Sequence, residues 1–432
     1  MQTNLADFIK DTREGKEAED ILRKCVHCGF CTATCPTYQL LGDELDGPRG
    51  RIYLIKQVLE GKPATAKTQQ HLDRCLTCRN CETTCPSGVQ YGRLVDIGRQ
   101  VVEKQVGRPL FQKLNRAALK AVLPRKWIFN PAMKLGQSLR AVLPRSLQNK
   151  VPLAQDAGLW PQTEHARKML LLDGCVQPAM SPNINAAAAR VLDAMGVQLQ
   201  IAQKAGCCGA IRYHLNEHED GLNDMRQNID AWWPYVEAGA EAIVMTASGC
   251  GATVKEYGHL LAHDAAYAGK AGKISMLTRD LSEILPEFQP QLVQRLQGNI
   301  NTLSKRIAWH PPCTLQHGQQ IRGKVEGLLT AIGVDVKLCA DSHLCCGSAG
   351  TYSVLQPKLS YQLRDNKVRN LEATDAEMIL SANIGCLTHL QSGTELPVQH
   401  WIELIDRALQ DSVISQDLPE ADSASSAVNK PE

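Results

Sequence analysis

Several features common in other protein classes are scarce or absent in these 432 residues. Aromatic residues make up only 5% and the formal net charge is +2, so neither base stacking nor a global field points to nucleic acid. No run of about 18 apolar residues occurs, so no transmembrane helix is expected. Neither G-x-G-x-x-G after a strand nor G-x-x-x-x-G-K-[ST] occurs, so nothing announces a flavin, NAD or ATP site.

A secretory signal is also missing, because the first twenty residues are polar and charged and contain no apolar core. Cysteine, by contrast, is abundant. There are 17 cysteines, an odd number, and most lie in tight clusters. We therefore expect reduced, metal-binding thiolates in a cytoplasmic protein rather than a framework of disulfides.

The first eight cysteines form two copies of one pattern, C-x₂-C-x₂-C-x₃-C-P, which is typical of two-cluster bacterial ferredoxins. Three closely spaced thiolates let one loop hold three corners of a [4Fe–4S] cluster, and the fourth, followed by proline, reaches the other cluster. Zinc sites pair C-x₂-C units and do not need this spacing twice, so zinc is the weaker alternative. The predicted ligands are Cys25, Cys28, Cys31 and Cys85 for one cluster, and Cys75, Cys78, Cys81 and Cys35 for the other.

The remaining cysteines reveal an internal duplication of about 137 residues. Each half has a cysteine after an apolar run, then Cys-Cys-Gly, then Gly-Cys. The members are Cys175, Cys207, Cys208 and Cys250 in the first half, and Cys313, Cys345, Cys346 and Cys386 in the second. One interpretation is an additional iron–sulfur or redox-thiol site. The other is buried structural thiols, which is also the expectation for the unpaired Cys339.

Five histidines could line such a site, although a lone histidine is more often structural than a ligand. They are His214, His310, His317, His343 and His389. Neither ferredoxin-like run contains an acid, base or nucleophile arranged for chemistry on an organic substrate. No catalytic residue is therefore assigned.

Apolar spacing predicts an α+β multidomain protein. Residues 1–105 form a helical, ferredoxin-like domain with two [4Fe–4S] clusters, and 106–165 form a basic amphipathic linker. Two tandem α/β cysteine-rich repeats follow at 166–300 and 301–410, and 411–432 form a disordered tail. Residues 104–168 hold thirteen Lys or Arg against two acids. The alternatives for this segment are a solvated linker, or a docking surface for an anionic membrane or an acidic partner.

The two sets of motifs resemble the family of iron–sulfur subunits of bacterial glycolate oxidase, also called glycolate dehydrogenase. The segments that carry the resemblance are CVHCGFCTATCPTY with DELDGPRGRIYLIK, CLTCRNCETTCPSGV, and the two CCG halves. The same architecture occurs in the small subunit of anaerobic glycerol-3-phosphate dehydrogenase. The CCG halves alone resemble lactate-utilisation proteins and a subunit of heterodisulfide reductase.

The resemblance implies a non-catalytic electron-transfer subunit on the cytoplasmic side of the inner membrane. Two partner flavoprotein subunits, which alone would hold FAD, would oxidise glycolate to glyoxylate, and the electrons would pass towards a membrane quinone. The reductase relatives end each half in C-x-x-C, whereas Ala247 and Asn383 occupy the first of those positions here. The alternatives are a subunit of a glycerol-3-phosphate or lactate dehydrogenase, a thiol or disulfide reductase site in the CCG halves, and a zinc-stabilised scaffold.

Overall fold

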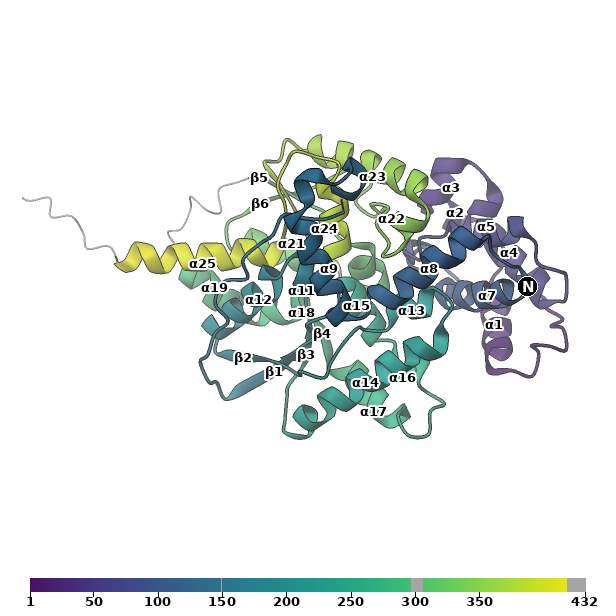
Figure 1. The fold of residues 1–432 in the computed structure, drawn as a ribbon, viewed down its shortest axis with the longest axis horizontal. Helices are drawn as coiled ribbons and strands as arrows, with labels where there is room; N and C mark the ends of the chain where they lie inside the picture. Colours follow the sequence, from purple (N-terminus) through teal and green to yellow (C-terminus); the bar gives the residue numbers. More distant parts are fainter. Residues whose placement is uncertain (149, 297–305, 418–432) are drawn as a thin grey trace, which may run out of the picture.

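The computed structural model describes residues 1–148, 150–296 and 306–417. The helical N-terminal part lies at one side of the molecule and helix α25 at the opposite end, with the two sheets between them (Figure 1). None of the helices in these ranges is long and apolar enough to cross a membrane.

The N-terminal part is helical, as the apolar spacing predicts. Its core consists of the apolar faces of α1, α4 and α7, including Leu22, Ile55 and Leu94, each almost completely buried. Pro48 begins α4, where its missing N–H costs nothing. The elements are α1 (Arg13–Lys24), α2 (Phe30–Ala33), α3 (Pro36–Leu41), η1 (Glu44–Asp46), α4 (Pro48–Leu59), α5 (Ala66–Asp73), α6 (Asn80–Thr83) and α7 (Tyr91–Gln105).

The basic segment folds into helices that lie against the rest of the chain. They are α8 (Leu110–Val122), α9 (Lys126–Ser138), η2 (Arg140–Val142) and α10 (Arg145–Gln148). Helix α8 packs on α13 and α9 packs on α11, so this segment crosses from the N-terminal helices onto the first repeat (Figure 1).

Salt bridges hold this segment down. Arg108 lies 2.6 Å from Asp73, Arg116 lies 3.1 Å from the same carboxylate, and Lys126 lies 2.6 Å from Asp173. Part of the positive charge that is conspicuous in the sequence is therefore paired with acids of other segments. The side chains that face outward here include apolar ones.

The internal duplication produces two four-stranded parallel sheets with the same topology. The order is β2-β1-β3-β4 in the first and β6-β5-β7-β8 in the second. The strands are β1 (Arg167–Leu171), β2 (Val197–Ile201), β3 (Ile243–Met245) and β4 (Thr278–Asp280), then β5 (Arg306–Trp309), β6 (Asp335–Leu338), β7 (Met378–Ser381) and β8 (Val398–His400). Leu170 pairs with Ile243 in the first sheet, and Ile307 pairs with Met378 in the second.

Helices cover both sheets, as parallel strands require. The first repeat contains α11 (Gln177–Met180), α12 (Asn183–Ala194), α13 (Ala210–His214), α14 (His218–Glu237), α15 (Ser248–Val254), α16 (Tyr257–Leu260), α17 (Ala268–Leu277), α18 (Leu281–Ile284), η3 (Leu285–Phe288) and α19 (Gln289–Leu296). The second contains the π-helical turn η4 (Thr314–Gly318), α21 (Lys324–Ala331), α22 (Tyr352–Leu355), α23 (Pro357–Glu372), α24 (Ile384–Gln391) and α25 (Trp401–Asp417).

The two repeats share one hydrophobic core. Helix α12 of the first repeat packs on α25 of the second, and Val191, Leu192 and Trp401 are fully buried in the same cluster. Helix α25 continues to Asp417 and so enters the segment predicted as a disordered tail, whereas residues 418–432 lie outside the described ranges. The predicted fold class, a helical ferredoxin-like part followed by two α/β repeats, is confirmed.

Candidate metal centres

The two ferredoxin-like loops adopt the same unusual backbone. Residues His27 and Gly29 in the first loop have φ of 57° and 88°, and Thr77 and Arg79 in the second have φ of 53° and 59°. A left-handed conformation costs a residue other than glycine ~1–3 kcal/mol, so such positions cluster at functional sites. The backbone amide of Thr77 points to the Cys75 sulfur at 3.4 Å. This strained turn therefore aims backbone N–H groups at the space between the thiols.

Each loop combines with the last cysteine of the other loop. Cys25, Cys28, Cys31 and Cys85 line one small cavity, which Cys81 also reaches. A second cavity is lined by Cys35, Cys75, Cys78 and Cys81. We name these the outer and the inner thiol site, because Cys28 is exposed whereas three of the four inner cysteines are buried. All 17 cysteines, every one within the described ranges, are free thiols, so both sites offer four sulfur donors to a metal.

Several thiols of the two sites have raised pKa values and are therefore not reactive anions. Burial raises the pKa of Cys31 to about 11, and it raises the pKa values of Cys78 and Cys81 well above the ordinary value for a thiol. Without a metal these groups stay protonated at neutral pH. Metal ligation requires thiolates, so binding at these sites must release protons.

A buried cationic group lies under the inner thiol site. The Arg51 side chain is 1% exposed and lines the same cavity as Cys35 and Cys75. Its guanidinium donates to the His71 carbonyl at 2.7 Å and approaches the Asp46 carboxylate at 3.4 Å. Asp46 and Arg51 both belong to the segment DELDGPRGRIYLIK, which is part of the family resemblance. The sequence alone does not show that these two charges lie beside a thiol site. The positive charge favours thiolates over thiols at this site, and it favours a negatively charged metal centre bound by them.

In both repeats, the second set of cysteines gathers at the carboxyl ends of the parallel strands. Cys313 follows β5, the vicinal pair Cys345 and Cys346 follows β6, and Cys386 lies on α24 after β7. Loops at this edge of a parallel sheet converge, which is why such edges form binding sites. The Cys313 and Cys345 sulfurs are 3.8 Å apart. Cys175, Cys207, Cys208 and Cys250 occupy the same positions in the first repeat.

The glycine of each Cys-Cys-Gly is required by a close approach of the backbone. Gly347 has φ of +89°, and a Cβ there would lie 2.5 Å from the Ser360 carbonyl oxygen on α23. In the first repeat Gly209 has φ of +88°, and its Cβ would lie 2.6 Å from the Gly221 oxygen on α14. Only glycine lets the vicinal cysteines lie against these helices.

One cavity of about 810 Å³ connects the inner thiol site with thiols of both repeats. Its lining includes Cys75 and Cys78 of the inner thiol site and thiols of both repeats. Apolar side chains of α8 and α9, such as Leu119 and Phe129, complete its wall. Cys345 and Cys313 pack in one cluster with Leu76, with Cys78 against it, so the inner thiol site adjoins the second repeat directly.

The comparisons with known proteins agree with this layout. A family model described as "4Fe-4S dicluster domain" matches residues 21–89, and one described as "Cysteine-rich domain" matches 169–255 and 307–391. The chain is 56% identical over 411 residues to the "Glycolate oxidase iron-sulfur subunit" of Escherichia coli (strain K12), covering 95% of this chain and 100% of that protein. The chain belongs to the family of glycolate oxidase iron–sulfur subunits. It is therefore an iron–sulfur protein whose dicluster domain binds 4Fe-4S clusters.

More distant relatives match most of the chain or about half of it. The "Probable glycolate oxidase iron-sulfur subunit" of Bacillus subtilis (strain 168) is 29% identical over 408 residues, covering 87% of this chain and 90% of that protein. The "Lactate utilization protein A" of Geobacillus thermodenitrificans (strain NG80-2) is 25% identical over 248 residues, covering 55% of this chain and 98% of that protein.

Within this family fold, most of the candidate histidines have ordinary partners. The His214 ring lies 3.2 Å from the Asp96 carboxylate, His317 lies 2.9 Å from the His343 carbonyl, and His389 lies 3.1 Å from the Ser360 hydroxyl. These contacts account for the three imidazoles. His343 itself is only partly buried and does not line the large cavity.

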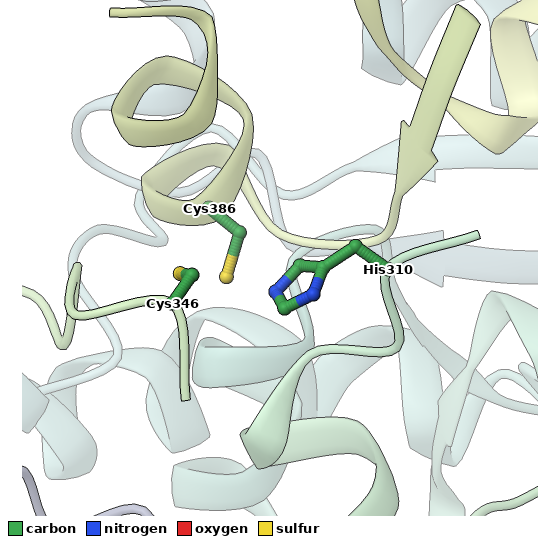
Figure 2. A group of neighbouring side chains, drawn as sticks. All are labelled: His310, Cys346 and Cys386. Carbon is green, nitrogen blue, oxygen red and sulfur yellow. The ribbon is translucent and has the colours of Figure 1, made fainter. Parts of the chain in front are cut away.

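His310 is different, and sequence reasoning did not separate it from the others. The imidazole is 1% exposed, and neither ring nitrogen has a hydrogen-bond partner among the described residues. Burial lowers its pKa well below the ordinary value, so the ring is neutral. It points towards Cys346 and Cys386, and the three ligand atoms lie within 4.8 Å of one another (Figure 2). The sequence contains one sign that His310 differs from the other histidines. The repeat offset of 138 aligns it with Leu172, an apolar residue.

Proposed function

We propose that this chain is the electron-transfer subunit of a flavin-dependent glycolate dehydrogenase complex. The observation that carries the proposal is the pair of four-thiol sites beside a third group of thiols, in a chain that is 56% identical to a named glycolate oxidase iron–sulfur subunit. Partner flavoprotein subunits would oxidise glycolate to glyoxylate. This chain would accept the electrons and deliver them towards a membrane quinone.

The proposed ligands are the cysteines of the two thiol sites. Cys25, Cys28, Cys31 and Cys85 would hold one [4Fe–4S] cluster, and Cys75, Cys78, Cys81 and Cys35 the other. Such clusters supply one-electron transfer when bound. The chain's own contribution is the strained loops that aim N–H groups at the sulfurs, the buried guanidinium of Arg51, and the exclusion of water from the inner site.

Each segment of the chain has its own proposed role. Residues 1–105 carry the two cluster sites, 106–165 form part of the wall of the large cavity, and 166–300 and 301–410 are the two repeats. The outer thiol site would face the donor, since Cys28 is exposed. The inner thiol site adjoins Cys313 and Cys345, so the second repeat is the next element inward.

A partner subunit would dock beside the outer thiol site. Three apolar side chains around this loop are exposed in the chain alone, namely Val26 at 69%, Phe30 at 61% and Tyr53 at 46%. Exposed apolar groups gathered at the edge of a redox site are typical of a protein–protein interface. The flavoprotein subunits are the proposed occupants, because electrons must enter close to the exposed site.

Membrane attachment is proposed for the outer face of residues 110–142. Exposed apolar side chains on this face are Leu110, Phe111, Leu114, Trp127, Leu135 and Val142. Lys104, Lys113 and Lys134 are exposed nearby, and none of them has a salt bridge within the described ranges. Apolar groups flanked by lysines suit the headgroup region of an anionic bilayer. This face offers the peripheral attachment that delivery to a quinone requires.

Flotation with vesicles tests the attachment. The Trp127→Glu and Phe111→Glu double variant should bind vesicles of phosphatidylglycerol and phosphatidylcholine more weakly than the wild type does. A control variant, Met276→Glu, changes an apolar side chain that is 65% exposed outside this segment. Equal flotation of all three proteins would exclude this face as the site of attachment.

Reduction by substrate tests the function. The chain is co-purified anaerobically with the proposed flavoprotein subunits, and glycolate is added. We expect glycolate to reduce the iron–sulfur centres of the complex and to leave those of the isolated chain oxidised. If flavin is reduced while the centres stay oxidised, the proposal fails. Parallel additions of D-lactate and glycerol-3-phosphate separate the family alternatives, because the substrate is chosen by the partner chain.

One observation favours a second candidate function, a thiol or disulfide reductase. Thiols of both repeats, among them Cys208 and Cys345, line one cavity of about 810 Å³, which is large enough for a small organic disulfide. In such a step the disulfide would take two electrons and two protons and give two thiols. Cys208→Ala and Cys346→Ala distinguish the two candidates. Unchanged electron transfer from the flavoprotein subunits, with loss of disulfide reduction, would favour the reductase.

A further inference from the structure

The two repeats share a fold but not the same set of donor atoms. Cys313, Cys345, Cys346 and Cys386 form a continuous row of thiols, each in contact with the next. The first repeat has the same row of four. Only the second repeat adds His310, which occupies the place of Leu172, an apolar residue packed in the core of the first repeat.

Hydrogen bonds of the His310 backbone hold this residue in position. Its N–H donates to the Leu380 carbonyl at 2.8 Å, and its own carbonyl accepts from the Ser381 hydroxyl at 2.9 Å. These bonds fix the turn at the end of β5. The side chain is thereby directed at the sulfurs of Cys346 and Cys386 (Figure 2).

The imidazole needs a partner that the described part of the chain does not supply. A buried polar group normally makes a hydrogen bond, because leaving it unpaired costs its full desolvation. Both ring nitrogens of His310 are buried and unpaired. A metal ion that accepts the ring's lone pair removes this cost at one of the two nitrogens, and imidazole and thiolate are both ligands that iron and zinc prefer.

We propose that His310 is a ligand of an iron–sulfur centre in the second repeat, with Cys346 and Cys386 as its neighbouring donors. The number of donors favours iron over zinc. One tetrahedral zinc ion uses four ligands, whereas the second repeat gathers five donors in one row. The choice of iron as the metal rests on the proposed function of this chain. The assignment of His310 as a ligand does not.

The histidine also makes the two repeats unequal as redox sites. The imidazole adds a neutral donor beside four thiols that match those of the first repeat, so a centre here has a ligand that the first repeat lacks. Of the two repeats, the second is also the one whose thiols pack against the inner thiol site. The second repeat is thus the one that adjoins the inner thiol site directly.

Pulsed EPR with isotope labelling tests the assignment. The whole chain is purified anaerobically with natural-abundance or ¹⁵N-labelled histidine, and oxidised and reduced samples are compared. We expect a histidine nitrogen coupling that changes with the label and is lost in His310→Leu, the residue of the first repeat. His310→Cys should also lose the coupling but keep the wild-type iron content. His343→Leu, a change of a partly buried histidine in the same repeat, should keep both.

This experiment can fail while the proposed electron-transfer function holds, because it reads out the metal site of the second repeat separately from the N-terminal clusters. His310→Leu should lose at least about one iron per chain, while the spectra of the two N-terminal clusters stay as in the wild type and show that the chain folds. The proposal is overturned if no paramagnetic state shows histidine nitrogen coupling, or if the coupling survives in His310→Leu. About one zinc per chain that disappears in His310→Leu would overturn the assignment to iron.

Discussion

Substituting the glycine of the second Cys-Cys-Gly should be far more damaging than substituting another glycine of equal φ. Gly347→Ala places a Cβ 2.5 Å from the Ser360 oxygen and 2.9 Å from the Leu363 Cβ. Gly333 provides the matched control, since its φ is +94° and no atom lies within 4 Å of the place that a Cβ would take. Both variants pay the left-handed penalty of ~1–2 kcal/mol. Only Gly347→Ala adds a backbone clash, which costs roughly 1–3 kcal/mol more.

Thermal unfolding of the anaerobically purified chain measures the difference. The Tm should fall about 1.5 to 4 times as far in Gly347→Ala as in Gly333→Ala, because the clash adds roughly 1–3 kcal/mol to a shared penalty of ~1–2 kcal/mol. Gly347→Ala should also lower the iron content, since the clash moves Cys346 away from its neighbours. Equal Tm shifts in the two variants would refute the claim that helix α23 requires glycine at this position.

The remaining predictions concern a buried charge, a buried imidazole and a docking surface. Arg51→Met should destabilise the N-terminal part by about 1.5–3 kcal/mol in urea unfolding, because the buried Asp46 carboxylate loses one partner and keeps Arg74 and His71; a loss below about 1 kcal/mol would contradict this. Burial lowers the pKa of His400 to about 3 from 6.5, so the unfolded chain binds more protons below pH 6.5, and stability is lost as the pH falls. Between pH 7 and 5 this group costs about 2 kcal/mol, and His400→Gln should weaken the acid dependence of Tm, whereas an unchanged dependence would count against the pKa shift. Phe30→Asp should weaken co-purification with the flavoprotein subunits and leave the iron content unchanged, while Met276→Asp should affect neither; equal recovery would exclude this face as the docking site.

The effect of His400 has a structural reason. Its Nε2 lies 2.9 Å from the Thr246 carbonyl oxygen of the first repeat, and its Nδ1 accepts from the Ile402 N–H at 3.2 Å. A second proton on the ring would place a donor against a donor. Acid therefore weakens a contact between the two repeats.

Periodic and repeated features could be predicted from the sequence. The helices containing Ile55 and Leu94, the cysteine spacing, and the duplication all follow from local patterns. The first two patterns are complete within a short stretch of chain, and the duplication needs only a comparison of the sequence with itself, so no knowledge of tertiary contacts is needed. The repeat of strand, loop and helix also predicted two α/β units.

Features that depend on contacts between distant segments could not be predicted in this way. The charge count of residues 104–168 does not show that Arg108 and Lys126 turn inward to Asp73 and Asp173. The partners lie far away in sequence. The role of His310 was hidden for a similar reason, since its environment comes from three loops. Only an alignment of the two repeats, which places it opposite Leu172, offered a clue.

The central claim is that the eight N-terminal cysteines hold two clusters and exchange their fourth ligands. EPR of the reduced chain with single Cys→Ser substitutions tests it most directly. The wild type should contain at least about eight irons per chain, and Cys85→Ser should alter the same signal as Cys28→Ser, while Cys35→Ser should alter the signal that Cys78→Ser alters. If Cys85→Ser instead affects the signal of Cys78, or if the wild type holds fewer than about eight irons, the claim is wrong.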